Sequence, residues 1–94
     1  MSPIRLTEHS DGNLYSGITK VVVKRAYGGG EISLDTFSVK DLERAISDKT
    51  KEFKANAYEP LKANLVNWSG EYHGQFRFYE IDKSALTRKK LELY

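Results

Sequence analysis

Residues 37–53 read FSVKDLERAISDKTKEF, and this stretch decides the fold class. At about 100° per residue, its large apolar side chains fall within an arc of about 60° on one side of a helix. Those side chains are Val39, Leu42, Ile46 and Phe53. The other side is charged, with both signs present, as is typical of a solvated surface. We therefore predict one amphipathic helix over about 39–57.

Signals at both ends support this helix. Ser38 is placed as the N-cap, with the carboxylate of Asp41 three residues later, and Phe37 stands where a hydrophobic staple to Leu42 is expected. Pro60 disfavours helical geometry at the residue before it, which predicts that the helix stops within about two residues of that point.

The residues before the helix favour strands. Gly17–Tyr27 contains the β-branched run 21–23, and 31–37 begins with alternating apolar and polar residues. The three glycines 28–30 between these segments are interpreted as a hairpin turn, so the two strands are expected to pair antiparallel. A shorter strand around residues 4–6 is expected to return through a turn at 10–13.

After the helix, residues 65–81 are interpreted as a hairpin that turns at His73-Gly74. This register pairs residues on one face of the hairpin, namely Trp68 with Tyr79 and Val66 with Ile81. Phe76 and Phe78 lie on the other face. One helix cannot cover both faces, so either residues 83–94 cover the second face or part of it stays exposed. Residues 83–94 fit either a short helix capped by Ser84 or a closing strand.

The predicted fold class is α+β. We expect a small antiparallel sheet of four to five strands, in the order β-β-β-α-β-β, packed on one amphipathic helix. The length of 94 residues predicts a single domain covering residues 1–94.

Composition excludes several kinds of site. The chain has no cysteine, which removes disulfides, thiolate metal sites and cysteine nucleophiles. Its two histidines, His9 and His73, lack partners at metal-ligand spacing, so no metal is expected. The longest aliphatic run is Val21–Val23, far too short to span a bilayer, and the N-terminus has no apolar signal region. We therefore expect a cytoplasmic protein that does not contact membranes.

Catalytic and cofactor motifs are also absent from the sequence. There is no Gly-x-Ser-x-Gly element, and the glycines 28–30 are not followed by a helix or by the Lys-Ser/Thr pair of a phosphate loop. The expectation is a protein without a cofactor and without enzymatic activity.

The leading functional hypothesis is a non-catalytic module that binds a larger protein. The chain has more aromatic residues than one small core needs, and aromatic residues and arginine commonly anchor interfaces. The expected anchors are Trp68, Tyr72, Phe76, Arg77, Phe78 and Tyr27. Small cysteine-free α+β chains of this kind are often encoded by phages or mobile elements and inhibit a host machine. An exposed edge strand would also permit a homodimer.

The competing hypothesis is a nucleic-acid-binding protein. Residues 76–79, Phe-Arg-Phe-Tyr, stand on a predicted strand and would stack bases, while basic residues would hold phosphates. Those basic residues are Lys20, Lys24, Arg25 and the cluster 88–90. The net charge of +2 is small for this role, because nucleic-acid binders usually carry a strongly basic surface.

The strand Phe76–Asp82, FRFYEID, resembles the final strand of the RelE/ParE-like toxins. The resemblance implies an RNA-cleaving reaction as a second alternative, for which Arg77, Tyr79 and His73 are the charge-stabilising and acid–base candidates. Those folds begin with helices, whereas strands are predicted here, so no site residue is carried over from the family.

Overall fold

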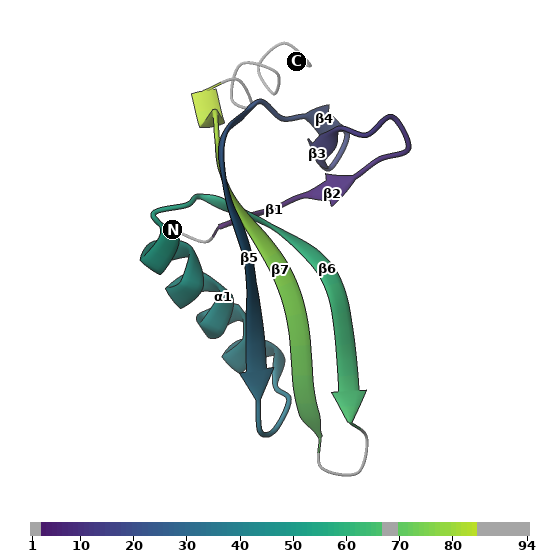
Figure 1. Cartoon of the computed structure of the whole chain (residues 1–94), viewed down its shortest axis with the longest axis vertical. Helices are drawn as coiled ribbons and strands as arrows, with labels where there is room; N and C mark the ends of the chain where they lie inside the picture. The colour runs from purple at the N-terminus through teal and green to yellow at the C-terminus, as the bar shows by residue number, and fades with distance from the viewer. Residues whose placement is uncertain (1–2, 67–69, 85–94) are drawn as a thin grey trace.

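The fold is α+β, as predicted, with one helix and two sheets (Figure 1). The computed structural model describes residues 3–66 and 70–84. In the four-stranded sheet the order is β1-β6-β7-β5, and in the three-stranded sheet it is β2-β3-β4. The elements in chain order are β1 (Ile4–Arg5), β2 (Thr7–Glu8), β3 (Leu14–Ser16), β4 (Thr19–Lys20), β5 (Val23–Leu34), α1 (Val39–Phe53), β6 (Ala57–Val66) and β7 (Glu71–Ile81).

The N-terminal strands depart from the expected simple meander. β1 pairs with β6 in parallel, whereas the other ladders are antiparallel. The turn predicted at residues 10–13 is present, but it joins β2 to β3 within the small sheet. The N-terminal segment therefore builds a second layer beside the upper end of the main sheet (Figure 1).

The helix has the predicted start and an earlier end. The backbone N–H of Asp41 donates to Ser38 Oγ over 3.2 Å, which confirms the N-cap. The helix ends at Phe53 because Lys54 adopts a left-handed conformation (φ 59°) and donates its N–H to carbonyls of the last turn. Val39 is 62% exposed, so its placement on the core face was wrong. Phe37, just before the helix, packs against the core at this end.

The prediction of a hairpin turn at the three glycines is wrong. β5 continues through Gly28–Gly30 without a turn, and its ladder with β7 continues from Gly28 to Leu34. Gly28 has a φ of 86° beside a register shift, and a Cβ on Gly29 would lie 3.3 Å from the carbonyl oxygen of Phe76. The glycines therefore allow the strand to bend and to approach its neighbour closely, which in the sequence looks the same as a turn signal.

The second predicted hairpin has its turn in the wrong place. His73 and Gly74 lie inside β7, and the connection from β6 lies between Val66 and Glu71. Val66 is opposite Glu71, and Tyr79 is opposite Ala57, so the predicted pairs with Ile81 and Trp68 are incorrect. Trp68 itself is outside the described residues.

Pro60 lies within β6, beyond the short stretch that β1 covers, where a missing N–H is tolerated at a sheet edge. Pro60, which was expected to mark the end of the helix, therefore lies inside a continuous strand. The register of β6 with β7 shifts between Pro60 and Lys62, which leaves Leu61 as an extra residue.

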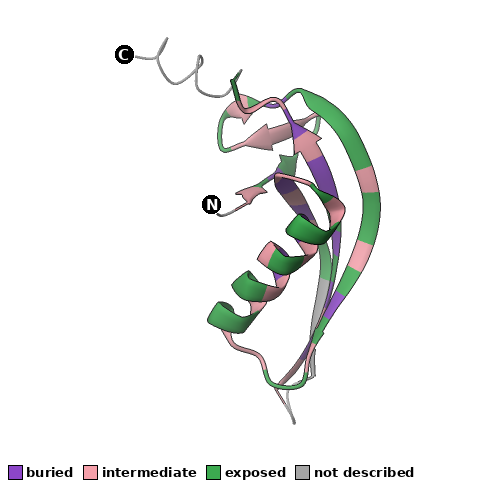
Figure 2. Ribbon diagram, turned by 90° about the vertical axis from the view of Figure 1, so that its left-hand side faces the viewer, coloured by how far each residue is buried: buried purple, intermediate pink, exposed green. Residues whose placement is uncertain are grey.

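Side chains of β7 supply a core on each face of the main sheet. On one face, Phe76 and Phe78 pack under the helix with Ile46, and Phe78 is fully buried. On the other face, Tyr79 and Ile81 join a second cluster with residues of the N-terminal segment. The predicted alternation along β7 is confirmed. Phe76 and Phe78, which were expected to anchor a partner, are covered, because the helix lies on that face (Figure 2).

Candidate functional site on the open face of the sheet

The face of the main sheet opposite α1 is only partly covered. We call this surface the open face. Along β7, Gln75 and Arg77 are exposed on it, while Phe76 and Phe78 between and beside them are buried on the helix side. The N-terminal strands cover the end of the open face at Tyr79 and leave the remainder accessible. A molecule that binds the accessible part of the open face would contact polar side chains. The cluster that contains Tyr79 and Ile81 lies next to this part.

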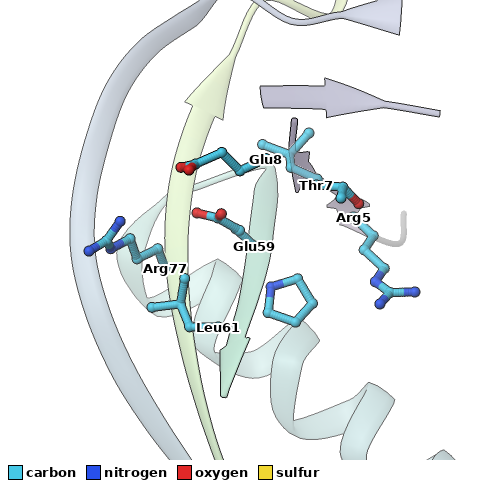
Figure 3. Close-up of a pocket in the computed structure, with 8 residues that line it drawn as sticks. Arg5, Thr7, Glu8, Glu59, Leu61 and Arg77 are labelled. Atoms are coloured by element: carbon cyan, nitrogen blue, oxygen red, sulfur yellow. The ribbon is translucent and has the colours of Figure 1, made fainter. Parts of the chain in front are cut away.

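A pocket of about 400 Å³ lies where the N-terminal strands meet the open face (Figure 3). We call it the junction pocket. It is lined by residues 5–8 of the N-terminal segment, 59–61 of β6 and Arg77 of β7. Its volume lies in the range of small-molecule sites, but such sites are mostly apolar and this one presents mainly polar groups.

The junction pocket is lined by one buried acid, Glu59, which is hydrogen-bonded to a buried phenol. Glu59 is only 6% exposed, and its Oε1 accepts a hydrogen bond of 2.9 Å from the hydroxyl of Tyr79. Burial raises the pKa of Tyr79, and the hydrogen bond to Glu59 raises the pKa further. Tyr79 therefore remains a protonated donor that fixes the carboxylate, and its hydroxyl is a poor general base.

Charges of both signs surround this pair. In Figure 3 the guanidinium groups of Arg5 and Arg77 point away to opposite sides, whereas the carboxylates of Glu8 and Glu59 both extend over β7. Within the residues that the structure describes, no ion pair joins these arginines to these acids. The pocket thus has two acids, two bases and no dominant charge.

Leu61 divides the junction pocket from a second hollow. The bulge in β6 leaves this side chain 43% exposed, and it lines both cavities. The second hollow has about 260 Å³ and is bounded by Glu31 and Gln75 together with glycines of β5. We call the two hollows and Leu61 the open-face groove. Bulges often re-aim a side chain in this way at functional surfaces.

A separate polar cluster surrounds His73 toward the other end of the open face. His73 Nε2 lies 2.6 Å from Glu71 Oε1, and Nδ1 lies 3.0 Å from Ser33 Oγ, which in turn donates to Glu31 over 3.0 Å. The hydrogen bond with Glu71 raises the pKa of His73 above its ordinary value. Protonated His73 donates from both nitrogens, so in this arrangement it does not act as the base that would activate Ser33.

The residues expected to anchor a partner occupy different environments. Tyr72, Phe76 and Phe78 are buried beneath the helix, so their expected exposure is wrong. Tyr27 is half-buried in β5 and donates to the carbonyl of Lys54 over 3.4 Å, which ties it to the end of the helix. Arg77 is exposed in the open-face groove. Trp68 is outside the described residues.

The acid–base candidates of the ribonuclease hypothesis do not converge. Arg77 and Tyr79 lie beside the junction pocket, but His73 is four residues before Arg77 on the same strand, about 13 Å along it. Phe76 and Phe78, on which bases were expected to stack, are not accessible either, because both side chains are buried under the helix.

Leu61 and Glu59 were missed by the sequence reading. Pro60 was interpreted as a signal that ends the helix, and the strand that carries Glu59 and Leu61 was not predicted there. No pattern in the sequence shows which residue of β6 is extra.

No family model, no curated protein and no solved structure matches this chain. Among the described residues, no helix is long and apolar enough to cross a membrane, and no group of three or more histidine, aspartate or glutamate side chains is arranged to hold a metal ion.

Proposed function

We propose that the protein is a non-catalytic module that docks on a larger protein through the open-face groove. The observation that carries this proposal is the exposed side chain of Leu61 between two hollows whose rims bear charges of both signs. An apolar centre with a polar rim is the usual anatomy of a protein interface. Inhibition of a larger host assembly by occupation of its surface is the corresponding mode of action.

Arg77 strengthens this reading. Among the expected anchors that the structure describes, it alone lies exposed on the groove, and arginine is among the residues that dominate binding energy at interfaces. Nucleic-acid binding has weaker support, because the acids of the groove offset its bases and phosphate recognition requires an excess of positive charge.

Two matched pairs of variants test the proposal. Leu61→Asp and Arg77→Glu change the groove, whereas Val39→Asp and Arg44→Glu make the same changes at exposed positions of the helix. In lysate of the cells that carry the gene, tagged wild type should retain one protein in a stoichiometric complex at moderate salt. Each groove variant should weaken that complex by about thirtyfold or more, the effect of an interface hot spot.

The helix variants should bind as wild type does. Retention of the partner by both groove variants would reject the groove as the docking surface. Retention of nuclease-sensitive material alone, with affinity that falls steeply as salt rises, would favour nucleic-acid binding instead.

A further inference from the structure

β5 has one backbone edge that no other described residue hydrogen-bonds. The strand is 12 residues long and pairs with β7 on one side only. Figure 2 looks onto its other edge, where most of the strand is exposed and the helix lies to one side of it. Strands average about five to six residues, and long unpaired edges invite pairing with another chain.

The two free edges of the main sheet are protected to different degrees. On the outer edge of β6, Pro60 and the bulge at Leu61 interrupt a regular ladder. β5 contains no proline, and its two register shifts both precede Gly28. From Gly29 to Leu34 the pairing with β7 has no register shift, and the glycines there carry no side chain that would keep a second backbone away.

The charges of β5 are arranged with opposite signs on either side of the glycines. Lys24 and Arg25 precede Gly28–Gly30, and Glu31 and Asp35 follow them. A second copy running parallel would set like charges together. An antiparallel copy with residues 28–30 opposite residues 28–30 places Arg25 opposite Ser33 of the second copy, which stands between Glu31 and Asp35 in the sequence. The basic segment of β5 in one copy therefore lies beside the acidic segment of a second copy related to it by a two-fold axis.

We propose that this edge is a homodimer interface, in which β5 pairs antiparallel with β5 of a second copy about the glycine segment. The main-chain hydrogen bonds supply the contact and the two charge clusters select the antiparallel register. The pairing joins two four-stranded sheets into one and leaves the open-face groove of each copy on an accessible face. The dimer forms without any other partner, so its test is independent of the proposed docking function.

Sedimentation velocity on the full chain tests the interface. Wild type should sediment as a dimer in the micromolar range at low salt, and dimerisation should weaken as salt screens the charges. Two variants reverse one cluster each: Lys24→Glu with Arg25→Glu, and Glu31→Lys with Asp35→Lys. Each alone places like charges across the axis, so its dissociation constant should rise at least about tenfold. An equimolar mixture of the two should recover a heterodimer.

Lys40→Glu with Arg44→Glu provides a control of equal net charge, because it reverses two exposed bases on the helix instead of the two in β5. This control should form homodimers as wild type does, and it should not form heterodimers when mixed with the variant that carries Glu31→Lys and Asp35→Lys. Circular dichroism establishes that each variant is folded, and Asp35→Lys alone replaces the double variant if that one unfolds. A monomeric wild type at low salt, or a mixture of folded variants that stays monomeric, would overturn the proposal.

Discussion

At the scale of single residues, a buried hydrogen bond joins the side chains of Tyr79 and Glu59. Both side chains are buried, and the carboxylate receives its single hydrogen bond within the described structure from the phenol. A buried charged acceptor that loses its donor keeps the cost of leaving water, which exceeds the net value of an ordinary hydrogen bond.

Tyr79→Phe should therefore lower the free energy of unfolding by about 1–3 kcal/mol. The matched control is Tyr15→Phe, which removes a hydroxyl that donates to Asp11 over 2.6 Å at an exposed site. The control should change stability by less than about 0.5 kcal/mol. Urea titrations of the three proteins measure both effects, and equal losses for the two variants would contradict the importance of burial here.

His73 should make stability depend on pH. Its pKa is raised in the folded state, chiefly by the hydrogen bond with Glu71, so the folded chain holds the proton more tightly than the unfolded chain does. This contribution is complete below about 6.5, the ordinary pKa of histidine. It is lost as pH rises through the raised pKa. The urea midpoint should fall across that window in wild type, and His73→Gln or Glu71→Gln should flatten the decline.

At the scale of elements, glycine positions explain how β5 follows the helix and β7. Gly28 occupies a positive φ at the register shift, whereas Gly30 does not. A Cβ at Gly30 would lie 3.5 Å from the ring of Phe78, an ordinary contact. The first position therefore requires glycine for its backbone conformation, and the second does not.

Gly28→Ala should destabilise the protein by about 1–2 kcal/mol, the cost of a left-handed conformation for an L-residue. Gly30→Ala should be neutral or stabilising, because alanine loses less entropy on folding and adds a packed methyl group. Thermal unfolding followed by circular dichroism distinguishes the two. The opposite ranking would mean that β5 does not follow the described path.

At the scale of the whole molecule, the two cores share β7, which places them on opposite sides of one strand. Phe78 belongs to the cluster under the helix, and Leu6 belongs to the cluster formed with the N-terminal segment. A cavity in either cluster should therefore destabilise the same central strand, and both clusters should unfold together.

Leu6→Ala should cost about 2–5 kcal/mol and Phe78→Ala about 3–5 kcal/mol. At about 0.05–0.15 kcal/mol per residue, either loss is a large fraction of the total stability of a chain this short. Val39→Ala, on the exposed side of the first helical turn, should change stability by less than about 0.5 kcal/mol. Near-ultraviolet and far-ultraviolet circular dichroism should give coincident transitions, and separate transitions would show that the cores are independent.

The sequence by itself determined the helix, its cap at Ser38, the α+β class and the alternation of side chains along β7. These properties depend on residues close together in the chain, where the period of 3.6 or of two is visible directly. It also placed Arg77 among the candidate anchors, and the structure leaves that residue exposed.

Only the tertiary structure decided where the strands turn and which face the helix covers. Glycines 28–30 and Pro60 carry the same local signals whether a strand turns, bends or runs along an edge, and contacts with β7 and β1 choose among these outcomes. The local sequence around Phe76 and Phe78 is compatible with either a covered or an exposed face of the sheet. The packing of the helix buries these two side chains, and the bulge in β6 exposes Leu61. The sequence did not reveal either feature, because each depends on contacts between residues distant in the chain.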